Sequence, residues 1–297
     1  MKNYLLSRLS LLIGFLLGAQ FFVTFLLIFA LYVSTFFLFN QEESLKHFVF
    51  NYKVHGIIFC SFLSISAGSI INQFYDREKD KITRPFRSRI QSFLKQKYFL
   101  YAYLLLNTLS LGIAAFISYR VFVFFLIYQF LMWLYSHKLS KILILNNLSF
   151  VGLSLYPFFG MLVYYQTYSV QLMLMSVFLF LILTSIDIIK DILTFHADRI
   201  FGYDTLANTF GIKAAKAITI VLVVLNLYVS AIIVDHHHLH NWMSGYFSVG
   251  MLLQIVIVYL LLNKSKFYSF SALNLLRLWV FIGILCMLID GIIAYLQ

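Results

Sequence analysis

The chain has 297 residues, of which 62% are hydrophobic and only 11% are charged. Soluble globular domains carry about 45–50% apolar and about 25% charged residues, so this composition excludes an ordinary soluble domain and favours a membrane protein. The formal net charge of +11 would suit a nucleic-acid partner, but a basic soluble domain would not also be this apolar, and we expect none. The two cysteines, Cys60 and Cys286, are too few for a disulfide framework or a zinc site.

Long apolar runs follow one another along the chain, and each is long enough to cross a bilayer, whose hydrocarbon core of about 30 Å needs roughly 20 helical residues. We therefore predict an all-α integral membrane protein of about nine transmembrane helices in one bundle, with residues 1–297 forming a single domain. In chain order, the predicted helices cover residues 10–38, 52–75, 98–118, 121–137, 144–164, 170–190, 214–234, 244–262 and 276–295.

Lys and Arg residues are unevenly distributed between the connections on the two predicted sides of the membrane. Three basic residues fall in the connections on one side, at Lys46, Lys53 and Arg120. The connection after the second helix alone holds more, at Arg77, Lys79, Lys81, Arg84, Arg87, Arg89, Lys95 and Lys97. Because Lys and Arg concentrate in cytoplasmic loops, we expect a cytoplasmic N-terminus and an outside C-terminus. We expect a multi-pass protein of a bacterial inner membrane.

Seven of the eleven acidic residues lie in two short segments, each at a predicted cytoplasmic helix end: Asp76, Glu78 and Asp80 in the first, and Asp187, Asp191, Asp198 and Asp204 in the second. In the first segment Asn72, Asp76 and Asp80 are spaced i, i+4 and i+8, so on a helix they share one face. Carboxylate and amide oxygens suit Mg²⁺, and the forked guanidinium groups of Arg84 and Arg87 match phosphate geometry. The alternative is a solvated helix end in which Asp80 and Arg84 form an i, i+4 ion pair.

The second segment contains Asp187, Asp191 and Asp198, with Lys190 between the first two. Asp187 ends an apolar run, and an ionisable residue at membrane depth is costly and by default a functional candidate. The alternative is that Asp187 only forms an ion pair at the membrane interface, with Lys190 or with Lys138.

Two acidic segments flanked by Lys and Arg predict a site for a diphosphate and its metal ions. Carboxylates would hold Mg²⁺, and the basic side chains would neutralise the charge that develops on a departing diphosphate. An allylic substrate would leave a carbocation, and an aromatic content of 19% suits cation–π stabilisation.

The chain resembles the UbiA superfamily of intramembrane prenyltransferases. Three stretches carry the resemblance: Asn72, Asp76 and Asp80 with Arg84-Pro85; Lys190-Asp191 followed by Asp198-Arg199, Gly202 and Thr205-Leu206; and Tyr135-Ser136-His137-Lys138 to Lys141 with Asn146-Asn147 after it. The departures are Gln73, where the family usually has Asp, Thr194, where many members have an acidic or small polar residue, and His196, at a position that is often Glu.

The resemblance implies an enzyme that transfers a prenyl group from a prenyl diphosphate to a lipophilic or aromatic acceptor within the membrane, with Mg²⁺ as cofactor and the active site on the cytoplasmic side. It implies metal ligands at Asn72, Asp76, Asp80, Asp191 and Asp198. It implies diphosphate contacts from Arg84, Arg87, Lys138, Lys141, Lys190 and Arg199. The catalytic candidates are Asp76, Asp191 and Asp187, of which Asp187 is either a metal-site residue or a base near the acceptor.

The acceptor stays open between a quinone precursor, haem, chlorophyll and a glycerol-phosphate lipid, and no protein partner is predicted. Two alternatives compete with the enzyme. One is a non-catalytic relative that binds prenyl lipids, which metal-dependent release of diphosphate would distinguish. The other is a multi-pass transporter, which predicts coupling residues near the membrane midplane and an inverted repeat. The acidic residues cluster at one membrane face, and we find no such repeat.

Overall fold

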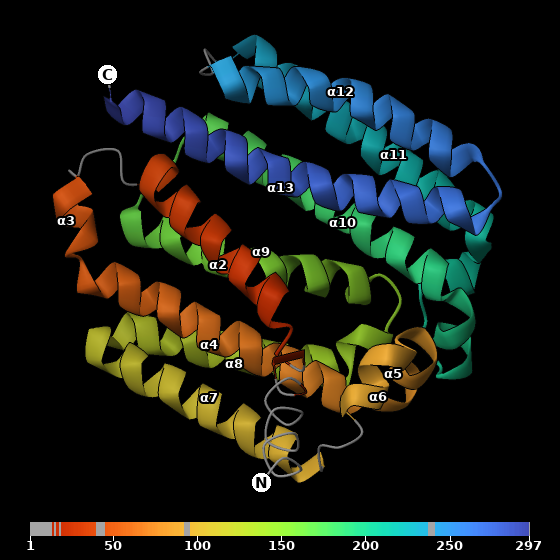
Figure 1. Ribbon diagram of the computed structural model, residues 1–297, viewed down its shortest axis with the longest axis horizontal. Coiled ribbons are helices and arrows are strands. Elements are labelled where there is room, and N and C mark those ends of the chain that lie inside the picture. Colours follow the sequence, from red (N-terminus) through yellow and green to blue (C-terminus); the bar gives the residue numbers. More distant parts are fainter. Residues whose placement is uncertain are drawn as a thin grey trace, which may run out of the picture. The chain divides into compact units, whose positions relative to one another are not determined.

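The computed structural model describes residues 14, 16–17, 19–39, 45–91, 96–236 and 241–296, and every regular element among them is helical (Figure 1). Within these residues nine helices are long and apolar enough to cross a membrane, in agreement with the predicted number. The predicted start of the first helix near residue 10 lies outside the described residues, as does Lys95.

The chain divides into two compact units, one of residues 1–32 and 42–140 and the other of residues 33–41 and 141–297, so that the first boundary falls within α2 (Phe21–Ser34). In the first unit α4, α7 and α8 pack on one another, and α5 and α6 form the connection between α4 and α7 (Figure 1). The bounds in this unit are α3 (Leu45–Val49), α4 (Tyr52–Tyr75), α5 (Arg77–Thr83), α6 (Pro85–Gln91), α7 (Gln96–Ile117) and α8 (Tyr119–His137).

In the second unit α10 packs against α9, α11 and α13, and α12 packs against α11 and α13 (Figure 1). A short π-helical segment, η1, contacts α9 and α13. The bounds are η1 (Thr35–Phe39), α9 (Leu145–Tyr165), α10 (Val170–Ile200), α11 (Leu206–His236), α12 (Asn241–Leu262) and α13 (Lys266–Leu296), and the 3-10 turn η2 (Leu139–Lys141) lies at the division.

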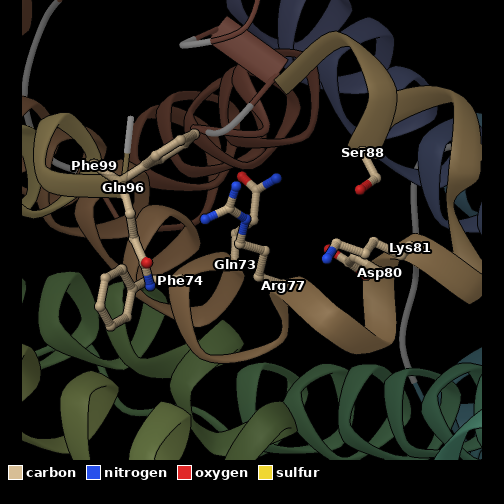
Figure 2. Close-up of a pocket in the computed structure, with 8 residues that line it drawn as sticks. All are labelled: Gln73, Phe74, Arg77, Asp80, Lys81, Ser88, Gln96 and Phe99. Carbon is tan, nitrogen blue, oxygen red and sulfur yellow. The ribbon is translucent and has the colours of Figure 1, made fainter. Parts of the chain in front are cut away.

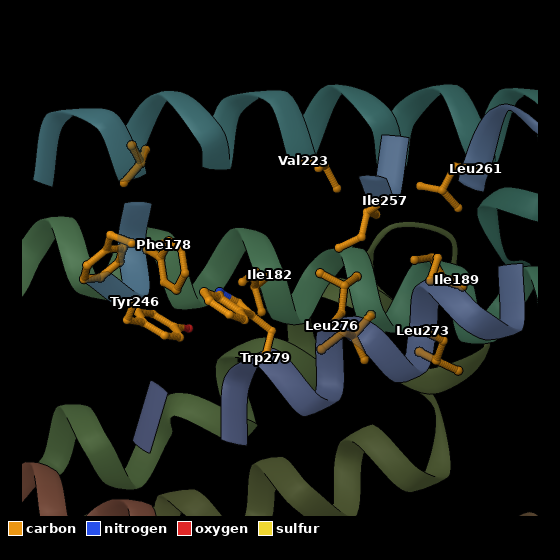
Figure 3. Packing of buried hydrophobic residues seen from close by; sticks show 14 of the residues in the cluster. Phe178, Ile182, Ile189, Val223, Tyr246, Ile257, Leu261, Leu273, Leu276 and Trp279 are labelled. Atoms are coloured by element: carbon orange, nitrogen blue, oxygen red, sulfur yellow. The ribbon is translucent and has the colours of Figure 1, made fainter. Parts of the chain in front are cut away.

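Aliphatic and aromatic side chains from α10 to α13 pack together in the core of the second unit (Figure 3). The rings of Tyr246 on α12 and Trp279 on α13 are stacked, with centroids 4.4 Å apart and an interplanar angle of 6°. A Cβ atom at Gly250 would lie 2.8 Å from the Trp279 ring, and one at Gly283 would lie 2.7 Å from Tyr246. The two glycines therefore let each ring lie close to the backbone of the opposite helix.

Short polar side chains set the first turns of several helices. Asn51, Ser118 and Ser169 precede α4, α8 and α10, and each accepts a hydrogen bond from the backbone N–H three residues later, at 3.3, 3.2 and 3.1 Å. Such caps satisfy one of the N–H groups that the first helical turn leaves without an intrahelical acceptor. They explain why the observed starts of α4 and α10 coincide with the predicted ones.

Three helices extend about ten residues beyond the predicted apolar runs, so the predicted boundaries were wrong at these ends. Helix α10 ends at Ile200, α11 begins at Leu206 and α13 begins at Lys266. A helix satisfies its own backbone hydrogen bonds and does not need an apolar solvent to continue. Gly211 interrupts α11 with φ 85° and ψ 159°, a conformation that favours glycine. Because α10 continues to Ile200, it carries Asp187, Asp191 and Asp198 of the second acidic segment, whereas Asp204 lies beyond its end.

Candidate active site

The first acidic segment lies where α4 passes into α5, and Asp76 is at the bend with φ −87° and ψ 6°. The backbone N–H groups of Asp76, Asp80 and Arg84 each donate to the carbonyl four residues earlier, at 2.9, 2.8 and 2.8 Å. The helical hydrogen-bond ladder therefore runs through the bend, and it keeps Asn72, Asp76 and Asp80 in the register that their spacing predicted.

Polar neighbours hold the carboxylates of this segment. The Nδ2 amide of Asn72 donates to Oδ2 of Asp76 at 3.2 Å, and the hydroxyl of Thr83 donates to Oδ1 of Asp80 at 3.3 Å. Burial raises the pKa of the Asp80 carboxyl above its ordinary value, although the Arg84 charge opposes this rise. Burial also lowers the pKa of the Arg87 guanidinium, and the like charge of Arg84 adds to that effect. Charged groups of both signs are thus partly withdrawn from water here.

A pocket opens beside this segment within the first unit (Figure 2). Its lining residues come from α4 to α7: Gln73, Phe74, Arg77, Asp80, Lys81, Ser88, Gln96 and Phe99. Gln73 is buried, and its Oε1 accepts a hydrogen bond from Nη2 of Arg87 at 3.3 Å. Gln73, a departure from the family pattern that the sequence resembles, therefore lines the same pocket as Asp80 and contacts a predicted diphosphate-binding arginine.

The three aspartates of the second acidic segment that lie on α10 are buried, with Asp187 and Asp198 0% exposed and Asp191 3% exposed. Two amides from the first turn of α9 bind it. The Nδ2 group of Asn147 donates to Oδ2 of Asp187 at 2.8 Å and to Oδ2 of Asp191 at 3.1 Å, and Nδ2 of Asn146 donates to the same Asp191 oxygen at 3.1 Å. Helix α9 therefore supplies hydrogen-bond donors that stabilise two neighbouring carboxylates on α10.

Lys190 supplies the positive charge in this cluster. Its Nζ forms an ion pair with Oδ1 of Asp187, lies 3.7 Å from Oδ1 of Asp191, and lies 4.9 Å from the centroid of the Phe150 ring. The ion pair between Asp187 and Lys190 that the sequence offered as an alternative is thus present. It coexists with the Asn147 contacts, so Asp187 belongs to a network and not to an isolated surface pair.

The two departures from the family pattern on α10 have different surroundings. The hydroxyl of Thr194 donates to Oδ2 of Asp198 at 2.6 Å, so Thr194 supports a predicted metal ligand. His196 is exposed, and its ring packs edge-on against Phe195.

Most of the predicted diphosphate-binding residues are exposed at helix ends. Arg84 follows α5, Lys138 follows α8, and Arg199 lies in the last turn of α10. Lys141 is exposed as well, with its Nζ 5.4 Å from the Tyr203 ring centroid. Its backbone carbonyl accepts a hydrogen bond from the N–H of Asp204 at 3.1 Å, which links the segment after α10 to the end of η2. These side chains are exposed on the protein, where an anionic ligand can reach them.

The oxygen-rich donors of both segments fit Mg²⁺, which takes carboxylate and amide oxygens and often keeps only one or two carboxylates from the protein. Among the described residues, no group of three or more His, Cys, Asp or Glu side chains is close enough to hold a metal ion by itself. A metal at either segment would therefore depend on further ligands, and substrate phosphates are the usual source.

Comparison with known proteins decides the family. The family model described as "UbiA prenyltransferase family" matches residues 47–281. The chain belongs to the UbiA prenyltransferase family. This confirms the predicted family and the predicted enzyme class, a prenyltransferase, and it excludes the transporter alternative. The match spans both acidic segments and all the helices from α4 to α12, so it covers the parts of the chain that carry the predicted chemistry.

Curated relatives in this family are archaeal digeranylgeranylglyceryl phosphate synthases. The chain is 27% identical to the one from Methanosphaera stadtmanae over 212 residues, which is 71% of this chain and 76% of that protein. It is 29% identical to the one from Pyrococcus furiosus over 175 residues, which is 59% of this chain and 62% of that protein. The alignment thus spans about three quarters of the first relative and less than two thirds of the second.

Solved structures show the UbiA fold over nearly the whole chain. One, from work on digeranylgeranylglyceryl phosphate synthase in membranes, has a TM-score of 0.72 at 20% identity and covers 95% of this chain and 98% of its own. The structure of a UbiA homolog from Archaeoglobus fulgidus bound to GPP and Mg²⁺ has a TM-score of 0.63 at 14% identity and covers 92% and 99%. An apo UbiA homolog from Aeropyrum pernix K1 has a TM-score of 0.68.

Proposed function

We propose that this UbiA-family chain transfers a prenyl group from a prenyl diphosphate to a hydroxyl group of a glycerol-phosphate lipid, with Mg²⁺ as cofactor. The observation that carries the proposal is that the family relatives aligned above are digeranylgeranylglyceryl phosphate synthases. Their name describes a glyceryl phosphate with two geranylgeranyl chains. The acceptor would accordingly be a glyceryl phosphate that already carries one such chain, and the donor a geranylgeranyl diphosphate.

The reaction breaks the bond between C1 of the prenyl chain and the diphosphate oxygen, and the diphosphate leaves with the electron pair. The acceptor hydroxyl oxygen forms the new bond to C1 and loses its proton. Cationic side chains aimed at the diphosphate stabilise the charge that develops on it. Apolar helices exclude water from the allylic carbon, so that the acceptor reacts there instead of water.

We propose site residues in each of the two acidic segments. Asn72, Asp76, Asp80, Asp191 and Asp198 would hold Mg²⁺, and Asp76 and Asp191 contribute most because each has an amide donor that keeps its carboxylate oriented. When bound, the ion would neutralise the leaving diphosphate. Arg84, Arg87, Lys138, Lys141, Lys190 and Arg199 would contact the diphosphate, with Lys190 placed directly beside Asp191. The donor sets and charges described above support this assignment.

The site is proposed to face the cytoplasm, with the N-terminus inside and the C-terminus outside. The support is the excess of Lys and Arg in the connection between α4 and α7 and beyond α12. We propose one catalytic domain over residues 1–297. The location in a bacterial inner membrane stays a prediction, and it differs from the archaeal origin of the relatives named above.

The test is turnover of radiolabelled prenyl diphosphates by the purified full chain in lipid nanodiscs. The acceptor panel contains a geranylgeranylglyceryl phosphate, its dephosphorylated form, a quinone ring precursor and haem. We expect product with the phosphorylated ether lipid and none in excess EDTA. Product with the quinone precursor or haem alone would overturn the acceptor assignment. Binding of prenyl diphosphate without product from any acceptor would favour the non-catalytic alternative.

A further inference from the structure

One amide nitrogen is shared between two buried carboxylates. Nδ2 of Asn147, on the first turn of α9, lies 2.8 Å from Oδ2 of Asp187 and 3.1 Å from Oδ2 of Asp191. Asn147 itself is 3% exposed. An amide nitrogen carries two protons, so one proton is available for each carboxylate. Asn147 is thus a bridge between two acids that are 40 and 44 residues away in the sequence.

The hydrogen bonds from Asn147 offset the repulsion between two buried carboxylates. Asp187 and Asp191 are one helical turn apart and almost fully buried, where like charges repel strongly because water does not screen them. Lys190 neutralises one of the two negative charges. The protons of Asn147, and the further proton from Asn146 to Asp191, stabilise the charged form of the remaining carboxylate without adding a second cation.

The contacts also divide the roles of the two aspartates. Both oxygens of Asp187 are engaged, Oδ1 by Lys190 and Oδ2 by Asn147. Asp191 receives both amides on Oδ2, whereas its Oδ1 is 3.7 Å from Lys190 Nζ, which is longer than a hydrogen bond. Oδ1 of Asp191 is therefore available to bind a cation, whereas both oxygens of Asp187 are used in contacts within the network.

We propose that Asn147 is a positioning residue that holds Asp191 for the metal ion and, by orienting Asp187, holds Lys190 for the diphosphate. Asp187 then also acts as a positioning residue, and not as a base for the acceptor. The inference rests on the proposed function, because it needs a metal and a diphosphate in this site. Partners of metal ligands that lie outside the coordination shell typically change metal affinity about 10–100-fold when mutated.

The experiment compares Asn147→Leu with wild type and with Ser154→Ala. Ser154 is the matched control, because it lies on the same helix and its hydroxyl donates to the carbonyl of Phe150 in that helix. The first readout is independent of turnover: the rise in unfolding temperature that Mg²⁺ and a non-hydrolysable prenyl diphosphate analogue produce. The second is the Mg²⁺ concentration for half-maximal turnover.

We expect Asn147→Leu to raise that Mg²⁺ concentration about tenfold and to lose most of the ligand-induced rise in unfolding temperature, while Ser154→Ala behaves as wild type. A folded Asn147→Leu protein with a wild-type Mg²⁺ response would overturn the proposal. The proposed function and the role of Asn147 can fail separately. If Mg²⁺ and the analogue stabilise the wild type but no acceptor is prenylated, the proposed function is contradicted. The comparison of unfolding temperatures between wild type and Asn147→Leu still tests the role of Asn147.

If Asn147→Leu does not fold, a pair of variants that exchanges the amide of Asn147 and the carboxylate of Asp187 tests the same role. Asn147→Asp places a third carboxylate against two others, and we expect it to lose ligand-induced stabilisation. Adding Asp187→Asn restores one amide and one carboxylate at this contact, so the double variant should recover part of it. The double-mutant cycle measures this coupling directly. Independent, additive effects of the two substitutions would show that the residues do not act as a pair and would overturn the proposal.

Discussion

The Asp290 carboxylate on α13 accepts a 2.7 Å hydrogen bond from the backbone N–H of Met243, in the first turn of α12. A second bond, from the N–H of Trp242, is 3.2 Å long. The first N–H groups of a helix have no intrahelical acceptors and carry partial positive charge, so Asp290 caps α12 from a neighbouring helix. This capping contact gives a buried acid in an apolar helix a structural role.

We expect Asp290→Ala to lower the free energy of unfolding by about 1–2 kcal/mol, because it removes a charged acceptor from the helix start. Asp290→Asn should cost less, since an amide oxygen still accepts one bond. Thermal unfolding of the detergent-solubilised chain measures both. Asp235→Asn is the control, because Asp235 is exposed near the end of α11. An effect of Asp290→Ala no larger than that of the control would refute the capping role.

The membrane-spanning helices were predictable because the apolar bilayer core requires a run of about 20 apolar residues to cross it. The predicted ranges for α4 and α8 agree with the structure within two residues at each end. The ends of α10, α11 and α13 were not predictable from hydropathy, because these helices continue in polar sequence. Neither was the bend at Asp76, where backbone hydrogen bonding continues although the dihedral angles change.

The charged residues of the candidate site were predictable from the sequence, but their neutral hydrogen-bond partners were not. The spacing of Asp187, Lys190 and Asp191 identified a cluster, and the structure shows its ion pair. Asn146 and Asn147 had no assigned role, because two neutral amides at the start of an apolar run also suit an ordinary helix start. Their contacts depend on how α9 packs on α10, which local sequence does not encode.

Two substitutions test the carboxylate assignment. Asp76→Asn and Asp191→Asn should each reduce turnover at least about 100-fold, because each removes a charge that holds the metal beside the leaving group. Asp204→Asn should change turnover less than about threefold, since Asp204 is exposed and contributes its backbone N–H to Lys141. Initial rates at saturating Mg²⁺, on variants with wild-type unfolding temperatures, provide the comparison. Equal losses in all three would contradict the assignment.

The proposed topology is tested by cysteine accessibility in intact cells. Single cysteines at Ile82, after α4, and at Lys264, after α12, should resist a membrane-impermeant thiol reagent, whereas one at Tyr168, before α10, should react. All three positions are exposed on the protein. The background is a chain with Cys60 and Cys286 replaced by alanine. Labelling at Ile82 and Lys264 but not at Tyr168 would invert the topology and place the site on the other face.

Gln73 offers a test of how this chain departs from its family. Its Oε1 accepts a hydrogen bond from Arg87, and it lines the same pocket as Asp80. Gln73→Glu keeps the length of the side chain and adds a negative charge, which should strengthen the contact with Arg87 and raise the local attraction for a cation. Gln73→Asp adds the same charge on a shorter side chain, which lies farther from Arg87.

We expect both variants to fold and to lower the Mg²⁺ concentration for half-maximal turnover by about threefold, since one added charge partly buried near the metal changes affinity by roughly half a kcal/mol or more. Gln73→Leu, which removes this hydrogen-bond acceptor without adding charge, is the control and should raise the KM for the prenyl diphosphate, because Arg87 loses its hydrogen bond to Gln73. Mg²⁺ titrations at fixed substrate, with KM measured at saturating Mg²⁺, separate the two effects. A weaker Mg²⁺ response in both acidic variants, with intact folds, would mean that the negative charge at position 73 acts on the cationic side chains that hold the diphosphate and not on the metal.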